Sequence, residues 1–307
     1  MSIPSIVVHG GSGEIPASIR KTDVKMKYLD AMKSALDEGY GMLKNGASAL
    51  EGVMMAVQIL EDCELFNAGK GSVFTVKGEH EMDAAVMDGK NLEAGAVAGV
   101  QGIKNPVRLA GDIMEHSPYV FLAGREAEEY ARRREFEFMP ASYFHTEFRA
   151  NQWKKTRGSG EMQLDHSSDD DDQQGTVGSV AVDEKGNLAV ATSTGGMTNK
   201  AWGRIGDSPL IGAGTYANNK TCAVSCTGHG EYFIRGVIAY DVSCRMEYGE
   251  ASLEEAAEKA INDRLKNLGG EGGLIAVDAR GNIAMPFNSE GMYRGMKNEH
   301  RTFTQIL

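Results

Sequence analysis

Residues 175–183 decide how this chain folds, and they read Gly175-Thr176-Val177-Gly178-Ser179-Val180-Ala181-Val182-Asp183. Positions 177–182 are apolar or small almost without a break, which is typical of a strand buried in a core. Directly before them lies the run Asp169-Asp170-Asp171-Asp172-Gln173-Gln174, which is too polar for a hydrophobic core. The Gly175–Thr176 bond therefore lies where a polar tether enters a buried strand.

A threonine at this place suggests a specific chemistry. If the Gly175–Thr176 bond breaks, Thr176 gains a free α-amine beside its own hydroxyl. A hydroxyl needs a base to become a nucleophile, and an N-terminal amine can supply one within the same residue. The arrangement predicts a hydrolase with a threonine nucleophile.

The stretch opens a predicted hairpin of residues 177–183 and 188–194, turned by Glu184-Lys185-Gly186-Asn187. A similar pattern recurs at residues 275–284, so a second hairpin is expected there. Between the hairpins we expect two helices, one near residues 231–248 and one with a capping box of Ser252 and Glu255. Strands followed by helices and further strands indicate an α+β layered fold.

Upstream of the stretch, residues 24–43 carry apolar side chains at helical spacing, and a second capping box (Ser48 and Glu51) opens the next helix. Two more helices are expected to start at Asn105-Pro106 and Ser117-Pro118. Residues 134–175 lose this regularity, and we interpret residues 150–175 as a flexible acidic linker.

Composition excludes several classes of protein. The net charge of -11 over 307 residues disfavours nucleic acid or an anionic membrane as a partner. No apolar run approaches the ~20 residues of a membrane span. The early run Ile6-Val7-Val8 is too short for a signal peptide, and four cysteines are too few for a disulfide framework. We expect a cytoplasmic protein with reduced cysteines.

Several motifs, in order, resemble the plant-type asparaginase and isoaspartyl peptidase family of N-terminal nucleophile hydrolases. They lie at residues 9–11, 66–69, 175–178, 191–196, 203–209, 212–218 and 225–231. The likeness covers nearly the whole chain apart from the linker and the last dozen residues. It implies a four-layer αββα sandwich, with antiparallel sheets between helical layers. It also implies self-cleavage into an α subunit (residues 1–175) and a β subunit (residues 176–307). The two subunits would form one folded domain, assembled as a dimer of αβ units.

The resemblance implies a role for each catalytic residue. Thr176 would be the nucleophile and its freed amine the general base, since an α-amino pKa of ~7.7–8 suits proton transfer near neutral pH. The Thr194 hydroxyl would hydrogen-bond the nucleophile. The Thr227 hydroxyl and the Gly228 backbone N–H would form the oxyanion hole.

The resemblance also implies how a substrate is held. Arg204 would clamp the substrate α-carboxylate, a task that suits the fork of a guanidinium. Asp207 would accept the α-ammonium group. Gly228, Gly230 and Asn67 would complete the substrate site. The implied substrates are L-asparagine and β-aspartyl (isoaspartyl) dipeptides.

No cofactor or metal is expected in catalysis, because His9, His116, His145 and His166 lack partners at metal-ligand spacing. The resemblance implies a structural sodium ion held by backbone carbonyls of Leu60, Glu61, Cys63, Phe66, Ala68 and Lys70.

Other functions compete with this interpretation. Glycosylasparaginase shares the nucleophile and the fold, but it would need a signal peptide and disulfides. A threonine endopeptidase is disfavoured by the Arg204 and Asp207 pair, which demands free α-groups. A non-enzymatic aspartate sensor would leave the chain uncleaved. Taken singly, Arg204 and Asp207 could also form only a surface salt bridge, and Thr194 and Thr227 could merely satisfy backbone groups.

Overall fold

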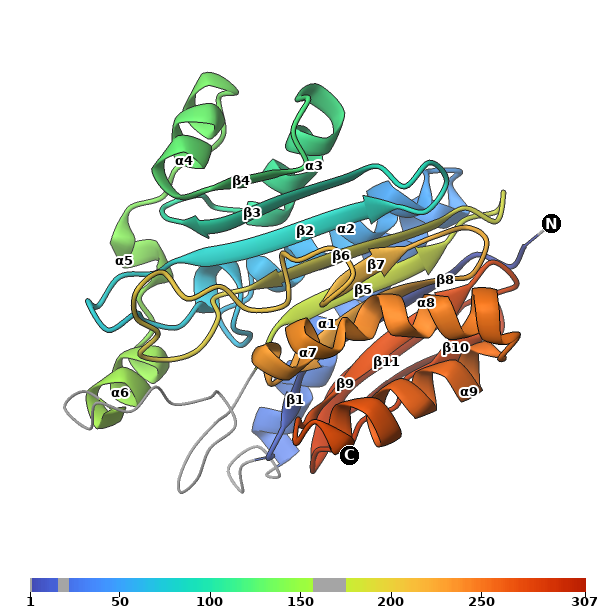
Figure 1. Ribbon diagram of the computed structural model, residues 1–307. Helices are drawn as coiled ribbons and strands as arrows, with labels where there is room; N and C mark the ends of the chain where they lie inside the picture. Colours follow the sequence, from blue (N-terminus) through green and yellow to red (C-terminus); the bar gives the residue numbers. More distant parts are fainter. Residues whose placement is uncertain (1, 16–21, 157–174) are drawn as a thin grey trace.

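Two β-sheets lie face to face at the centre of the molecule, and helices cover their outer faces (Figure 1). The computed structural model describes residues 2–15, 22–156 and 175–307. Its mixture of helices and sheets confirms the predicted α and β class. The acidic run at residues 169–174 lies outside the described residues.

The larger sheet has eight strands in the order β12-β11-β1-β5-β6-β2-β3-β4. Its strands are β1 (Ser5–Gly13), β2 (Met82–Asp88), β3 (Ala94–Val100), β4 (Phe121–Ala123), β5 (Val177–Val182), β6 (Leu188–Thr194), β11 (Gly291–Asn298) and β12 (Thr302–Gln305). Strand β5 is central and buried on both faces, which explains why residues 177–182 read as a nearly continuous apolar run.

The smaller sheet has four strands in the order β10-β9-β8-β7. Its strands are β7 (Thr215–Ala217), β8 (Cys222–Gly228), β9 (Gly272–Asp278) and β10 (Ile283–Ala284). The two predicted hairpins, β5–β6 and β9–β10, are both present, one in each sheet. A core of small and β-branched side chains, among them Val7, Val180 and Ile275, fills the space between the sheets.

Helices pack on the outer face of each sheet. The helices against the larger sheet are α1 (Thr22–Lys44), α2 (Ala49–Glu61) and α3 (Pro106–His116). Those against the smaller sheet are α7 (Gly230–Gly236), α8 (Ile238–Gly249), α9 (Leu253–Glu258) and a π-helix over Lys259–Leu265. The remaining helices are α4 (Gly124–Arg133), α5 (Ala141–Phe144), α6 (Glu147–Thr156) and a 3-10 turn over Gly69–Gly71.

Both predicted capping boxes are confirmed. The Ser48 side chain accepts a hydrogen bond from the Glu51 backbone N–H at the start of α2, and the Glu51 carboxylate accepts one from the Ser48 backbone N–H in return. Ser252 and Glu255 form the same reciprocal pair before α9. Each box satisfies backbone N–H groups that the first turn of a helix would otherwise leave unpaired.

Four local expectations are wrong. Residues 150–156 are not linker but part of α6, which Arg149 anchors by donating from Nε to the carbonyl of Gly71 at 2.9 Å. No helix starts at Ser117-Pro118, where the chain instead leads into β4. The sheets are not wholly antiparallel as expected, since β4 pairs parallel to β3 after α3 carries the chain across between them. The helix expected near residues 231–248 is broken at Val237, whose φ of 51° is left-handed.

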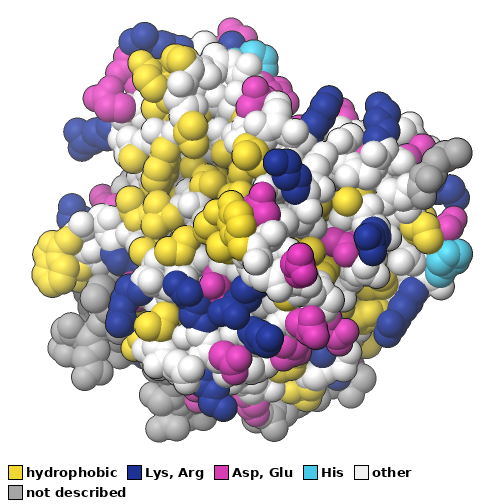
Figure 2. All heavy atoms as spheres, turned by 45° about the vertical axis from the view of Figure 1, so that its right-hand side comes forward, with side chains coloured by type: hydrophobic (Ala, Val, Ile, Leu, Met, Phe, Trp, Pro, Cys, Tyr) yellow, Lys and Arg dark blue, Asp and Glu magenta, His cyan; other side chains and the backbone are white. Residues whose placement is uncertain are grey.

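Hydrophobic side chains gather over part of one face of the molecule (Figure 2). The exposed large apolar residues include the consecutive Tyr119, Val120 and Phe121, which are 61%, 54% and 39% exposed.

In the described part of the chain, no helix has both the length and the apolar character needed to cross a bilayer.

Candidate active site

The register of the central strands brings Thr176 beside Thr194. Val177 pairs with Ser193 in the antiparallel β5–β6 ladder, so the residue before β5 meets the last residue of β6. The Thr176 hydroxyl donates to Thr194 Oγ1 at 3.1 Å. It also lies 3.3 Å from the hydroxyl of Ser208. Thr176 is only 8% exposed, so these contacts form away from bulk water.

A rigid loop holds Thr194 in place. Thr194 Oγ1 accepts a hydrogen bond from the backbone N–H of Gly196 at 3.0 Å. Asn67 fixes the same loop, since its Nδ2 donates to the Gly196 carbonyl at 2.7 Å and its own carbonyl accepts from Gly195 N–H at 3.0 Å. Asn67 thus holds the loop next to the candidate nucleophile, and its contact with substrate stays a prediction.

The Gly175–Thr176 peptide is packed against β1. A Cβ added to Gly11 would lie 2.5 Å from Gly175 N and 3.0 Å from its Cα. Gly11 also has a φ of 120°, a conformation that L side chains rarely adopt. Only glycine at position 11 allows the two backbones to approach this closely.

Thr176 and Gly175 line one small pocket. Its other lining residues are Thr194, Gly196, Met197, Arg204, Gly206, Asp207, Ser208 and Gly228. The cavity measures about 20 Å³, which is room for about one water molecule.

Arg204 is held at the pocket by a carboxylate that the sequence analysis did not single out. Its Nε and Nη2 donate to the two carboxylate oxygens of Glu231 at 2.9 and 3.0 Å. Gly206 and Gly230 let the guanidinium lie flat between them, because a Cβ on either residue would come within about 3 Å of it. The Nη1 side of Arg204 is not used by Glu231. The alternative of a surface salt bridge between Arg204 and Asp207 is therefore wrong.

Asp207 is a buried carboxyl group with unused hydrogen-bonding capacity. It is 4% exposed, and its Oδ2 has no hydrogen-bond partner among the described residues. Burial raises the pKa of Asp207 to about 7, and the positive charge of Arg204 opposes that rise. A Cβ on Gly230 would lie 2.9 Å from Asp207 Oδ1 and 3.0 Å from Arg204 Nη2, so both side chains meet at this glycine.

Gly228, the last residue of β8, lines the pocket, whereas Thr227 lies directly before it and is not among the lining residues. Thr227 is fully buried, and within the described ranges its Oγ1 has no hydrogen-bond partner. Its carbonyl accepts from the Ser12 hydroxyl at 3.2 Å, which fixes the strand end. Gly228 has a φ of 145°, and a Cβ there would lie 2.4 Å from the Glu271 carbonyl oxygen. Among the described residues, Asp207 Oδ2 and Thr227 Oγ1 are therefore buried polar atoms with hydrogen-bonding capacity to spare.

A chain of hydroxyl groups connects the site to a buried histidine. The Thr215 hydroxyl donates to the Ser208 carbonyl at 2.9 Å and lies 2.7 Å from Thr192 Oγ1. Thr192 lies 2.8 Å from the Ser225 hydroxyl, which lies 2.8 Å from His9 Nε2. Burial lowers the pKa of His9 to about 3, so the ring stays neutral and can only hydrogen-bond. The network holds the Ser208 carbonyl in place through Thr215.

The loop expected to bind sodium is tightly wound on itself. A Cβ on Gly69 would lie 2.4 Å from the Glu61 carbonyl oxygen, and one on Gly71 would lie 2.1 Å from that of Phe66 and 2.6 Å from that of Glu64. Backbone carbonyl oxygens are ligands that hard cations prefer, and two of the carbonyls expected to bind sodium, those of Glu61 and Phe66, lie against glycines of this loop.

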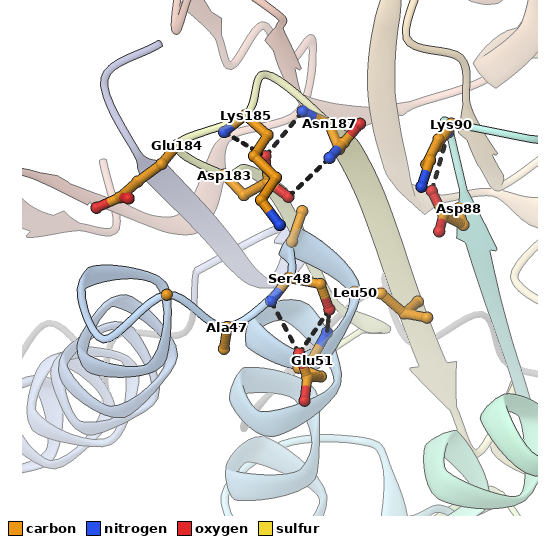
Figure 3. A pocket seen from close by; sticks show the side chains of 12 residues that line it. Ala47, Ser48, Leu50, Glu51, Asp88, Lys90, Asp183, Glu184, Lys185 and Asn187 are labelled. Atoms are coloured by element: carbon orange, nitrogen blue, oxygen red, sulfur yellow. Dashed lines mark hydrogen bonds between the residues drawn. The ribbon is translucent and has the colours of Figure 1, made fainter. Parts of the chain in front are cut away.

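A second, larger pocket lies elsewhere and lacks this chemistry. It measures about 370 Å³ and is formed by the start of α2 and the turns after β2 and β5. Its polar side chains are largely engaged with the backbone, as Figure 3 shows for Asp183 and Glu51. None of the residues from the candidate active site lines it.

Ser208 and Glu231 are the site residues that the sequence analysis missed as individual groups. Both lie within the quoted motifs, at residues 203–209 and 225–231, but a motif does not reveal which side chain touches which. His229 has a half-buried ring that accepts from Glu271 N–H at 3.3 Å, and this contact gives it no chemical role.

Comparisons with known proteins agree with this geometry. The model of a family described as asparaginase matches residues 2–306. The isoaspartyl peptidase of Escherichia coli (strain K12) is 51% identical over 292 residues, which cover 94% of this chain and 91% of that protein. The probable isoaspartyl peptidase/L-asparaginase 2 of Arabidopsis thaliana is 40% identical over 316 residues, 96% of each protein. The isoaspartyl peptidase/L-asparaginase of Mus musculus is 43% identical over 294 residues, 95% of this chain and 88% of that protein.

Proposed function

The chain belongs to the asparaginase family, and from that premise we propose that it hydrolyses L-asparagine and cleaves β-aspartyl (isoaspartyl) dipeptides. The observation that carries the proposal is the buried Thr176 hydroxyl, 3.1 Å from Thr194 in a pocket that Arg204 and Asp207 also line. Both proposed substrates present an aspartyl β-carbonyl next to a free α-carboxylate and α-ammonium group.

We propose that the protein first matures into an active enzyme by cleaving its own Gly175–Thr176 bond. Thr176 Oγ1 attacks the Gly175 carbonyl carbon, the peptide C–N bond breaks, the hydroxyl proton passes to the leaving nitrogen, and the acyl group is left on oxygen as an ester. Water then hydrolyses this ester, which frees the Gly175 carboxylate and the Thr176 α-amine. The packing of Gly175 against Gly11 supports this step, because it holds the peptide close to the hydroxyl in a fixed geometry.

In turnover, the freed amine takes the proton from Thr176 Oγ1 as the oxygen attacks the β-carbonyl of the substrate. The proton then passes to the leaving group, which departs as ammonia or as the amino group of the second residue. The remaining aspartyl ester is hydrolysed by water to L-aspartate. Thr194 accepts a hydrogen bond from Thr176 and thereby orients the nucleophile.

The polar groups of the pocket match the ends of an aspartyl substrate. The Arg204 edge that Glu231 leaves unused is suited to the α-carboxylate. The unpartnered Asp207 Oδ2 is suited to the α-ammonium group, whose positive charge favours the ionised carboxyl. The unpartnered Thr227 Oγ1, with the Gly228 N–H, is suited to the oxyanion.

The fold and assembly belong to the same proposal. We infer that the two stacked sheets and their outer helices form the four-layer αββα sandwich of N-terminal nucleophile hydrolases, with residues 1–175 and 176–307 as α and β subunits. We further propose a dimer of αβ units. The exposed run Tyr119, Val120 and Phe121 supports self-association, because monomers rarely expose large apolar patches. Light scattering on a size-exclusion column tests this assembly.

A structural sodium ion is also proposed, held by the backbone carbonyls of Leu60, Glu61, Cys63, Phe66, Ala68 and Lys70. The Glu61 and Phe66 carbonyls, which lie against Gly69 and Gly71 in this loop, support it. An ion that binds only the folded state raises the melting temperature as its concentration rises. Melting curves in NaCl and in choline chloride at equal ionic strength test this, and equal melting temperatures in both salts would contradict it.

A cytoplasmic location is proposed as well, because the four cysteines are all free and a reducing compartment keeps thiols unpaired.

The direct test of the activity measures aspartate released by the cleaved protein from L-asparagine and from a β-aspartyl dipeptide. Release from either substrate, absent in Thr176→Ala protein, supports the proposal. A cleaved protein that releases no aspartate from either substrate would contradict it.

A further inference from the structure

A buried carboxylate that the mechanism above does not use lies next to Thr194. Asp83 is the second residue of β2 and pairs directly with Thr194 in the antiparallel β2–β6 ladder. Directly opposed residues of such a pair place their Cβ atoms about 5 Å apart on the same face of the sheet. Asp83 is fully buried there.

The face that these two side chains share is the one toward the smaller sheet. Thr192, two residues before Thr194, contacts Ser225 of β8 across the gap between the sheets. Ser193 points the other way and donates to Glu61 of α2 at 2.6 Å. Because side chains alternate along a strand, Thr194 and Asp83 face the same inter-sheet space as Thr192.

The hydrogen bonds of Thr194 leave its proton without an acceptor. Its Oγ1 already accepts from Thr176 Oγ1 at 3.1 Å and from Gly196 N–H at 3.0 Å. A hydroxyl group has two acceptor sites and one donor, so both acceptor sites are filled and the proton must be donated elsewhere. The described residues include no direct acceptor for it.

Asp83 has the complementary deficit. Its Oδ1 accepts from the Gly99 backbone N–H at 2.8 Å, whereas its Oδ2 has no hydrogen-bond partner in the described part of the chain. A buried carboxylate oxygen without a partner is costly, so such an atom usually serves a purpose. The negative charge of Asp83 also contributes to the raised pKa of Asp207, which places it within electrostatic reach of the pocket.

We propose that Asp83 is a positioning residue for the nucleophile, and that its Oδ2 accepts the Thr194 hydroxyl proton through one bridging water molecule. With its proton directed at Asp83, Thr194 can only accept from Thr176. The contact with Thr194 then fixes the position of Thr176 Oγ1 in the resting site, and the proton leaves for the freed amine as the oxygen attacks. This inference rests on the proposed function, and it adds a residue that acts on Thr176 only through Thr194.

Asp83→Asn is a sharp probe because Gly99 fixes the orientation of the new side chain. The Gly99 N–H requires the amide oxygen of the asparagine, so the NH₂ group takes the place of Oδ2. A donor then replaces an acceptor at nearly constant volume, and the bridging water loses the acceptor that fixes its orientation and, through it, the orientation of the Thr194 hydroxyl. We expect kcat to fall about 10- to 100-fold, as is usual when an outer hydrogen-bond partner is lost, with KM within about threefold of wild type.

A double-mutant cycle with Thr194→Val separates positioning from general damage. If Asp83 acts through Thr194, Asp83→Asn has little further effect on kcat once Thr194 is valine. Asp83→Glu keeps a carboxylate and should restore most of the lost kcat. Asp88→Asn is the matched control at the other end of the same strand, where Asp88 caps a turn by accepting from Lys90 N–H (Figure 3). It should leave kcat unchanged.

The experiment measures kcat and KM for β-aspartyl dipeptide hydrolysis, the melting temperature, and the rate of self-cleavage of each full-length variant. If a variant matures too slowly for an activity assay, the same cycle is read on its rate of self-cleavage over a longer incubation, since that step uses the same hydroxyl. Asp83→Asn activity within threefold of wild type would overturn the inference. So would losses that multiply in the double variant, or an Asp83→Glu enzyme as slow as Asp83→Asn. A wild-type enzyme that cleaves itself but hydrolyses neither substrate contradicts the proposed function instead, and the cycle on self-cleavage still decides the role of Asp83.

Discussion

Replacing Gly11 by alanine tests whether the close packing at the Gly175–Thr176 bond is required for self-cleavage. The added Cβ would lie 2.5 Å from Gly175 N, whereas ordinary contacts begin at 3.4 Å. Gly175 must therefore move by about 0.9 Å, or β1 must yield by the same amount.

Two effects set the size of the loss. A displacement of about 1 Å at a reacting centre can cost about 100-fold in rate. The φ of 120° at position 11 adds strain of about 1–3 kcal/mol for any residue with a side chain. Movement of β1 to relieve this strain also disturbs the peptide. We expect self-cleavage to slow by about 100-fold or more, while the protein stays folded.

The assay follows the intact chain and its two fragments by mass over time at neutral pH. Gly41→Ala is the matched control, because Gly41 lies within α1 with nothing within 4 Å of an added Cβ. It should cleave at the wild-type rate and melt slightly higher, since alanine favours helix over glycine. Gly11→Ala protein that cleaves within threefold of wild type would refute the reasoning.

Two further predictions concern the groups that would hold the substrate. Below pH 7, log(kcat/KM) should fall with a slope of two in wild type, because two groups take up a proton there. One is the free amine, and the other is the Asp207 carboxylate, whose pKa burial raises to about 7. In Asp207→Asn the slope should be one, and an unchanged slope of two would rule out Asp207 as the second group. Glu231→Gln removes the charged partner of Arg204, and since Glu231 is 50% exposed the pair is worth only about 0.5–1 kcal/mol. KM should therefore rise about two- to fivefold with kcat unchanged, whereas a loss confined to kcat would show that Glu231 acts on the chemistry instead.

The elements that the sequence predicted correctly are those governed by local rules. The Ser48–Glu51 box starts a helix because each partner satisfies the other within four residues. The turn of the β5–β6 hairpin is formed by Asp183, whose Oδ1 accepts from the Lys185 and Asn187 N–H groups, and by Gly186, whose φ is 80°.

The errors arise where distant contacts override local preference. Residues 147–156 form α6 although their apolar pattern is weak, because Arg149 is buried against the carbonyl of Gly71. Val237 separates α7 from α8 because its backbone is left-handed, a conformation that favours glycine or asparagine. Since neither residue type stands at position 237, the sequence does not predict this break.

The candidate site follows the same division. Family motifs indicated Thr176, Thr194, Arg204 and Asp207, and the fold brings all four to one pocket. The partners that fix these residues come from elsewhere in the chain. Asp83 meets Thr194 only through the β2–β6 register, 111 positions apart. Such a pairing depends on the order of strands in the sheet, which a single sequence does not specify.

The measurement that tests the central claim most directly is the intact mass of freshly purified protein after incubation at neutral pH, beside a Thr176→Ala variant. We predict two fragments from wild type, residues 1–175 and 176–307, and one unbroken chain from the variant. An unbroken wild-type chain would contradict the claim that Thr176 becomes an N-terminal nucleophile, as would cleavage of the variant at the same bond.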